Sequence, residues 1–140
     1  MKPRVLILCT GNSARSQLAE GLLRSMADGT LDVFSAGTKP SFVRPEAIAV
    51  MAERGIDISA HTSKHVDEVK GQSFDYVITV CDNARETCPI FPGAPRRIHW
   101  SLPDPAATEG SEEQRLEAFR NVRAMLTVRL GEFLRELART

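Results

Sequence analysis

Short apolar runs alternate along the chain with longer amphipathic segments, and this alternation admits few folds. The apolar runs lie at 4–8, 31–35, 76–80 and 97–100, and each has the length of a β-strand. The segments at 14–27, 45–54 and 112–137 carry apolar residues every three or four positions, as helices with one buried face do. Strands separated by helices form parallel sheets with right-handed crossovers. We therefore expect an α/β fold, with a single domain over 1–140, a four-stranded parallel sheet and helices on both faces.

Charge and hydropathy narrow the classes of partner. The chain has 18 basic and 18 acidic residues, so it carries no net charge that would attract nucleic acid or an anionic membrane. No apolar run approaches the roughly twenty residues of a bilayer-spanning helix, and the first residues lack the pattern of a signal peptide. We expect a cytoplasmic protein that binds neither nucleic acid nor membrane and acts as a monomer.

Reactive side chains follow three of the four predicted strands. Cys9 comes directly after the first strand, Cys81 directly after the third, and Asp104 just after the fourth. The carboxyl ends of parallel strands meet at one edge of the sheet, which is where such folds bind ligands. Three cysteines in a reducing compartment are either small core residues or reactive groups. Their common placement favours the second reading, so we interpret these residues as catalytic.

The segment CTGNSAR, from Cys9 to Arg15, has the composition of an anion-binding loop. Its small residues let successive backbone N–H groups point at one centre, and it opens into a helix whose N-terminus attracts anions. The same field lowers the pKa of a cysteine thiol, so we expect Cys9 to be a nucleophilic thiolate. Arg15 can bind two oxygens of an oxyanion, and Ser16 can donate a hydrogen bond to the thiolate. The predicted oxyanion-binding residues are Thr10, Gly11, Asn12, Ser13, Ala14 and Arg15.

The stretch VLILCTGNSARSQLAEGLLR at 5–24 resembles the signature of the low-molecular-weight tyrosine phosphatase fold. More narrowly, it is similar to the thioredoxin-coupled arsenate reductases that share this fold. The resemblance extends from Arg4 to the last helix and implies the strand order 2-1-3-4. The pair Asp104-Pro105 matches the loop that supplies the general acid in both groups.

Two cysteines separate the reductases from the phosphatases. A phosphatase needs one cysteine, an arginine and an aspartic acid, and it typically carries an aromatic residue where this chain has Ala106. The segment VCDNARETCPIFPG at 80–93 resembles the redox segment of the arsenate reductases, and its cysteines, Cys81 and Cys88, are too widely spaced for a zinc knuckle. Pro89 and the Pro/Gly-rich residues that follow suit a short helix that can unwind. The alternatives are a phosphatase and a non-catalytic oxyanion-binding or redox-sensing module.

The resemblance implies a three-cysteine thiol relay. Cys9 attacks arsenate, Asp104 protonates the departing oxygen, and Cys81 then attacks Cys9 so that arsenite is released. Cys88 attacks Cys81, which leaves a Cys81–Cys88 redox-active disulfide for thioredoxin to reduce. The implied partners are arsenate, with phosphate or sulfate as analogues, and thioredoxin. A weak phosphatase side activity is also expected.

Many members of this family bind potassium beside the anion loop. The residues of this chain that match that site are Asn12, Glu20, Ser35 and Thr62. The acidic position two residues after Thr62 is occupied by Lys64, whose ammonium group can take the place of the cation. We expect no potassium requirement, no other metal and no tightly bound cofactor.

Overall fold

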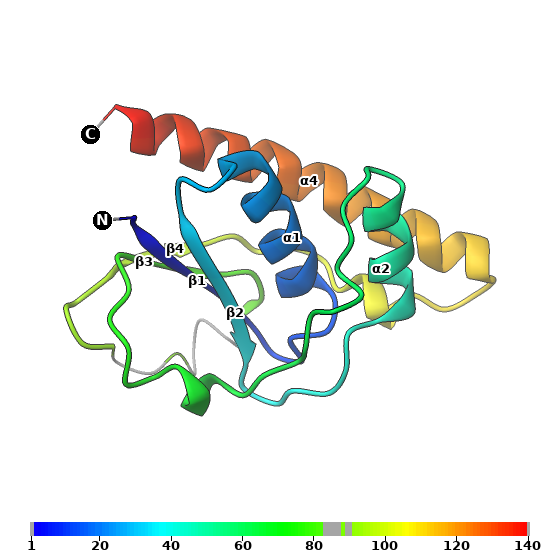
Figure 1. Ribbon diagram of the computed structural model, residues 1–140. Coiled ribbons are helices and arrows are strands. Elements are labelled where there is room, and N and C mark those ends of the chain that lie inside the picture. The colour runs from blue at the N-terminus through cyan, green and yellow to red at the C-terminus, as the bar shows by residue number, and fades with distance from the viewer. Residues whose placement is uncertain (1, 83–87, 89–90, 140) are drawn as a thin grey trace.

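Residues 2–82, 88 and 91–139 of the chain are described by a computed structural model, shown in Figure 1. Four parallel strands form one sheet in the order β2-β1-β3-β4. They are β1 (Arg4–Cys9), β2 (Asp32–Gly37), β3 (Tyr76–Thr79) and β4 (Arg96–His99). The predicted α/β class and strand order are confirmed. β1 is almost fully apolar because it pairs on both sides and is covered on both faces.

Three longer helices lie within the described residues. They are α1 (Arg15–Ala27), α2 (Pro45–Ala52) and α4 (Glu112–Ala138). In Figure 1, α1 and α4 lie above the sheet and α2 packs beside them, whereas the short helix η1 (Val66–Glu68) lies below it. Among the described residues, therefore, the second face carries this short helix and a group of apolar side chains rather than a long helix. Phe74 of that group makes edge contacts with both Phe34 and Phe91.

The long helix α4 is specified by its cap and its apolar stripe. Ser111 and Gln114 form a capping box at its N-terminus, which satisfies backbone N–H groups that have no partner within the helix. Its buried apolar side chains recur at helical spacing and are Phe119, Val122, Leu126, Leu130 and Phe133. None of the helices within the described ranges is long and apolar enough to cross a membrane.

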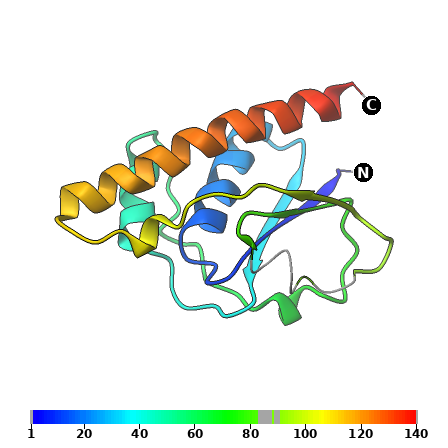
Figure 2. The same ribbon diagram turned by 180° about the vertical axis from the view of Figure 1, so that it is seen from behind.

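Alternate residues of β3 and β4 face opposite sides of the sheet. Tyr76 stacks edge-on against Phe133 of α4, whereas Val77 and Thr79 line a cavity on the other side together with Cys88. After β4 the chain runs along α4 and forms the short helix η2 (Pro105–Ala107), as Figure 2 shows. This path returns Asp104, the residue that caps η2, to the edge where β1 ends.

The end of β2 lies tightly against the loop that follows β1. A Cβ atom built on Gly37 would be only 2.5 Å from the Thr10 carbonyl oxygen and 2.8 Å from the Asn12 backbone nitrogen. Only glycine allows this close approach of two backbones. The sheet therefore fixes one side of the predicted anion loop.

Candidate active site

The loop from Cys9 to Arg15 turns its carbonyl groups outward. The acceptors and their donors are Thr10 O with Lys39 N (2.8 Å), Gly11 O with Ser41 N (3.1 Å), Asn12 O with Gln17 Nε2 (3.0 Å) and Ser13 O with Arg44 N (3.0 Å). In a trans peptide the N–H points opposite to the C=O, so the N–H groups that follow these carbonyls point inward. Asn12 adopts a left-handed conformation with φ 46°, which tightens the loop. The result is a nest, a concave set of backbone donors of the kind that binds anions.

A pocket of about 210 Å³ opens at this nest. It is lined by Cys9, Thr10, Gly11, Ser13, Ala14, Arg15, Ser41, Arg44, Asp104 and Ala106. The structure thus brings together Cys9, Arg15, Asp104 and most of the predicted oxyanion-binding loop. Asn12 stands behind the pocket rather than in its lining, with its side chain fully buried among hydroxyl groups.

The terminal nitrogens of Arg15 contact other residues, whereas its Nε remains available as a donor. Its NH1 donates to the Leu102 carbonyl oxygen (3.0 Å), and its NH2 lies 3.8 Å from Oδ2 of Asp104. Its Nε is buried and has no hydrogen-bond partner within the described part of the chain. A buried N–H of this kind costs free energy unless a ligand accepts from it, so the geometry fits an oxyanion bound in the pocket.

Cys9 and Cys81 are both buried and interact directly. The hydrogen bond to Cys81 and burial raise the pKa of Cys9 above its ordinary value, and the Arg15 guanidinium only partly opposes this. We expected the loop to lower this pKa; the expectation is wrong for the resting pair, because the hydrogen bond to Cys81 and burial both favour the neutral thiol. Cys81 is itself held by Thr10, whose Oγ1 lies 3.2 Å from its Sγ. The structure therefore places a second thiol against the nucleophile.

Cys88 is half-buried on the far side of β3 and β4. Burial raises its pKa, whereas the Arg97 guanidinium, whose NH1 lies 2.8 Å from its Sγ, acts in the opposite direction. No disulfide joins Cys9, Cys81 and Cys88 within the described residues. The helix that we predicted between Cys81 and Pro89 falls mostly at 83–87 and 89–90, outside the described residues.

His99 contacts residues on both sides of Cys81 in the sequence. His99 at the end of β4 makes one contact to Oγ1 of Thr79 (2.7 Å) and another to Oδ1 of Asp82 (2.8 Å), the residue after Cys81. Sequence reasoning missed this arrangement, because the three residues belong to different segments and have no metal-binding spacing. The described residues contain no cluster of three or more His, Cys, Asp or Glu that could hold a metal ion.

Asp104 faces the pocket in a position suited to proton transfer. Its Oδ1 accepts a hydrogen bond from the Ala106 N–H (3.0 Å), which orients the carboxyl group, and its side chain is 44% exposed. Oδ2 points toward Arg15 at 3.8 Å. A carboxyl group fixed at the mouth of an anion pocket can give a proton to an oxygen that leaves.

Behind the nest lies a row of buried hydroxyl and carboxyl groups. Asn12 Nδ2 donates to Oγ of Ser16 and to Oγ of Ser35, each at 2.9 Å, and Ser35 donates to Glu20. Ser16 is thus positioned through Asn12, and its predicted hydrogen bond to Cys9 stays a prediction. Glu20 also pairs with Arg24, whose NH2 lies 3.1 Å from Oε2.

The residues that match a potassium site already have partners in this chain. Lys64 Nζ donates to the Thr62 carbonyl oxygen (2.9 Å), and Gln17 Nε2 donates to the same oxygen (3.1 Å). The backbone N–H of Lys64 donates to the side chain of Asn12 (2.8 Å). Glu20, Thr62 and Asn12 thus have partners within the described chain, and the lack of a potassium requirement stays a prediction.

Two pocket residues were missed by the sequence reasoning, Ser41 and Arg44. Arg44 precedes α2, and its Nε is buried without a hydrogen-bond partner in the described ranges. Its position just before Pro45 suggested only a helix start. No local pattern indicates that the chain returns to the anion loop at this point.

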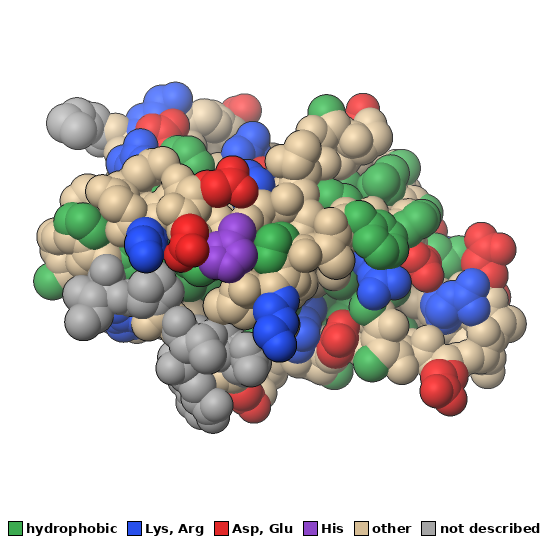
Figure 3. Space-filling view, turned by 90° about the horizontal axis from the view of Figure 1, so that it is seen from below, with side chains coloured by type: hydrophobic (Ala, Val, Ile, Leu, Met, Phe, Trp, Pro, Cys, Tyr) green, Lys and Arg blue, Asp and Glu red, His purple; other side chains and the backbone are tan. Residues whose placement is uncertain are grey.

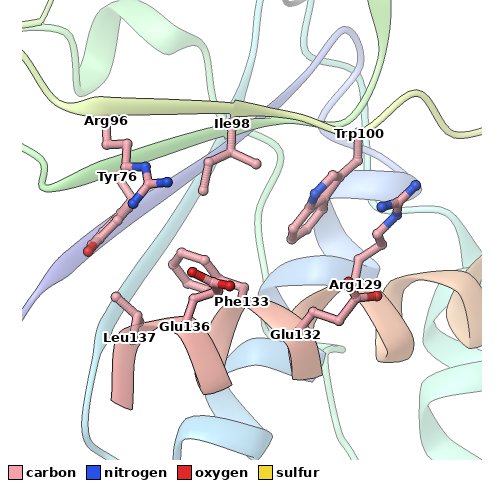
Figure 4. Close-up of a pocket in the computed structure, with 9 residues that line it drawn as sticks. All are labelled: Tyr76, Arg96, Ile98, Trp100, Arg129, Glu132, Phe133, Glu136 and Leu137. Carbon is pink, nitrogen blue, oxygen red and sulfur yellow. The ribbon is translucent and has the colours of Figure 1, made fainter. Parts of the chain in front are cut away.

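A separate groove lies between β4 and the C-terminal half of α4 (Figure 4). Its volume is about 230 Å³, and Arg96, Arg129, Glu132 and Glu136 surround an apolar floor. The floor contains Tyr76, Ile98, Trp100, Phe133 and Leu137. On the face shown in Figure 3, basic and acidic side chains are interspersed rather than gathered by sign.

Known proteins are similar to this chain in both sequence and fold. A family model described as low molecular weight phosphotyrosine protein phosphatase matches residues 4–140. An arsenate reductase from Halalkalibacterium halodurans is 42% identical over 132 residues, which cover 94% of this chain and 95% of that protein. Among solved structures, an arsenate reductase in the phosphate binding state has a TM-score of 0.78 and 34% identity, covering 97% of this chain and 98% of the other. A thioredoxin-dependent arsenate reductase from Corynebacterium glutamicum has a TM-score of 0.73 and 27% identity, covering 98% of this chain and 62% of that one. The chain therefore belongs to the arsenate reductases that share the low-molecular-weight phosphotyrosine protein phosphatase fold.

Proposed function

We propose that the chain reduces arsenate to arsenite by a relay through Cys9, Cys81 and Cys88. The observation that carries this proposal is that Cys9, which lines the oxyanion pocket, is hydrogen-bonded to Cys81, a second buried thiol that also contacts Thr10 of the anion loop. A phosphatase needs one nucleophile and gains nothing from a second thiol hydrogen-bonded to it. A reductase needs that thiol beside the first, because the electron pair that reduces arsenic comes from the formation of a disulfide.

The first half of the reaction takes place in the pocket. The backbone nest and Arg15 bind arsenate, and an oxygen of the arsenate dianion accepts the proton of the Cys9 thiol. The Cys9 thiolate then attacks arsenic while Asp104 protonates the hydroxyl group that leaves as water. Cys81 then attacks the Cys9 sulfur. The S–As bond breaks, its electron pair stays on arsenic, which passes from As(V) to As(III), and arsenite departs. The two sulfurs are left as a Cys9–Cys81 disulfide.

The second half returns the pocket to its starting state. Cys88 thiolate attacks Cys81, the Cys9–Cys81 bond breaks, and Cys9 leaves as a thiolate. The product is a Cys81–Cys88 disulfide, which an external dithiol reduces with two electrons. We propose thioredoxin as that dithiol, as in the relative from Corynebacterium glutamicum. We also place the chain in the cytoplasm, where thiols are kept reduced, and expect it to act as a monomer.

Cys9, Arg15 and Asp104 are also the set that a phosphatase requires. We propose a weak phosphate ester hydrolysis as a side activity, with phosphate and sulfate as competing ligands of the same pocket. Ala106 at the pocket rim offers no aromatic surface for a phosphotyrosine ring, so efficient hydrolysis of such esters is not expected.

The test is a single-turnover comparison of Cys88→Ser with Cys81→Ser. With thioredoxin, thioredoxin reductase and NADPH present, Cys88→Ser should release about one arsenite per enzyme and stop with Cys9 and Cys81 linked, as peptide mass spectrometry can detect. Cys81→Ser should release little arsenite. Hydrolysis of p-nitrophenyl phosphate needs neither residue and serves as the control for an intact pocket. Continuous turnover by Cys88→Ser would refute the relay.

A further inference from the structure

We propose that Arg44 is a second substrate-binding guanidinium, which together with Arg15 selects dianionic tetrahedral oxyanions. This inference rests on the proposed function, since it names the residue that would recognise the charge state of arsenate. Arg44 lines the same pocket as Cys9 and Arg15, and it comes from a different part of the chain, the residue that caps α2.

The backbone fixes Arg44 relative to the anion nest. Its own N–H donates to the Ser13 carbonyl oxygen (3.0 Å), and the N–H of Ser41 donates to the Gly11 carbonyl oxygen (3.1 Å). Residues 41–44 are thus hydrogen-bonded to the outer side of the loop whose N–H groups point into the pocket. The Arg44 backbone is bonded to Ser13 O, one of the outward carbonyl groups of the loop, so its side chain starts from a defined position beside the nest.

The guanidinium of Arg44 has no carboxylate partner within the described ranges. Two arginines of α4, by contrast, pair with glutamates in or next to α2. Arg115 pairs with Glu46 at 3.3 Å. The Nε of Arg123 also lacks a partner in the described chain, but this arginine lies outside the pocket, and its charge is paired with Glu53 through NH1 at 2.8 Å. The Nε of Arg44 is buried without a hydrogen-bond partner in the described chain, as is the Nε of Arg15. Two arginines that line one pocket and share this feature indicate donors that a ligand satisfies.

An aromatic ring supports the Arg44 side chain from one side. The guanidinium carbon lies 4.8 Å from the centre of the Phe42 ring, within the range of a cation–π contact. Such stacking restrains the planar group through its face and leaves its N–H edge for hydrogen bonds. The arrangement orders the side chain without neutralising its charge.

Charge balance gives the role of the second arginine. The positive charge of Arg15 is partly offset by Asp104, 3.8 Å away. The dianionic form of arsenate carries two negative charges, so the single guanidinium of Arg15 leaves one of them uncompensated. Arg44 supplies the missing positive charge, and it should favour a dianion over a monoanion of the same shape.

The experiment measures anion binding both with and without turnover. Arg44→Gln, Arg44→Lys and Arg54→Gln are compared; the last removes an exposed arginine just after α2 that does not line the pocket. The first readout is KM and kcat for arsenate. The second is the concentration of inorganic phosphate that protects Cys9 from alkylation by iodoacetamide, an uncharged reagent. Circular dichroism and thermal melting confirm that each variant is folded.

Arg44→Gln should raise KM for arsenate and the half-protecting phosphate concentration about tenfold or more, the usual consequence of losing a charge-assisted hydrogen bond. The change in kcat should be much smaller, Arg44→Lys should recover part of the binding, and Arg54→Gln should behave like the wild type. Unchanged phosphate protection in Arg44→Gln, or an equal loss in Arg54→Gln, would overturn the assignment. If wild-type protein failed to turn over arsenate while Arg44→Gln still lost phosphate protection, the proposed function would fail and the role of Arg44 would stand.

Discussion

Gly37→Ala tests whether the shape of the anion nest, rather than its residues alone, supports catalysis. Gly37 lies at the end of β2 and makes no contact with substrate in the relay proposed above. Its missing side chain leaves room for the loop after β1. An alanine Cβ there would lie 2.5 Å from Thr10 O, 2.8 Å from Asn12 N and 3.0 Å from Asn12 Cβ.

The size of the effect follows from these distances. Ordinary van der Waals contact begins at 3.4 Å, so the separation from Thr10 O must grow by about 0.9 Å. β2 cannot simply withdraw, because the N–H groups of Thr38 and Lys39 bond to Cys9 O (3.3 Å) and Thr10 O (2.8 Å). The nest must deform instead. A displacement of this size in a catalytic group typically costs about a hundredfold in rate, and overpacking typically costs about 1–3 kcal/mol of stability.

The assay pairs kcat/KM for arsenate with phosphate protection of Cys9 against alkylation. Gly71→Ala is the matched control, because a Cβ at Gly71 would have no atom within 4 Å. We expect Gly37→Ala to lose about two orders of magnitude in kcat/KM and most of its phosphate protection while it remains folded by circular dichroism. Wild-type values of both quantities in folded Gly37→Ala would show that the reasoning about the nest is wrong.

Three further predictions follow from the site. Asp104→Asn keeps the shape of the pocket but removes its proton donor, and it should lower the arsenate turnover rate by about a hundredfold or more; undiminished turnover would remove Asp104 from the mechanism. Exchange of sodium for potassium should barely change the melting temperature or activity of the wild type, because Lys64 Nζ occupies the Thr62 carbonyl oxygen, and Lys64→Asp should gain a saturable response to potassium that sodium does not reproduce. A clear potassium response in the wild type would contradict this. Arg97→Gln should make Cys88 react more slowly with iodoacetamide at neutral pH, because it removes a guanidinium that lowers the pKa of that buried thiol. Arg96→Gln, on the α4 side of β4, should have no such effect.

The local sequence pattern was enough to predict the main helices and strands and the loop from Cys9 to Arg15. The strands at β1 and β3 and the helices α1 and α4 begin and end within a residue or two of the predicted positions. Such patterns depend on contacts between residues one to four positions apart, which the order of residues fixes directly. The Cys9 loop was predictable for the same reason, because its donors and Arg15 are contiguous in the chain. The strand order, by contrast, came from the resemblance to a family and not from periodicity.

Tertiary structure decided the chemistry that depends on distance between segments. Cys9 and Cys81 are 72 positions apart, so their contact, and the raised pKa of Cys9 that it causes, could not be predicted from the loop alone. Arg44 reached the pocket because residues 41–44 bond to the loop carbonyls, and no spacing in the sequence encodes that return. The pKa of a group depends on interactions with every element packed around it, and so does whether a donor finds a hydrogen-bond partner. The sequence by itself therefore determined which groups could react, and the packing of β2, α2 and β3 around the loop decided which of them meet and with what charge.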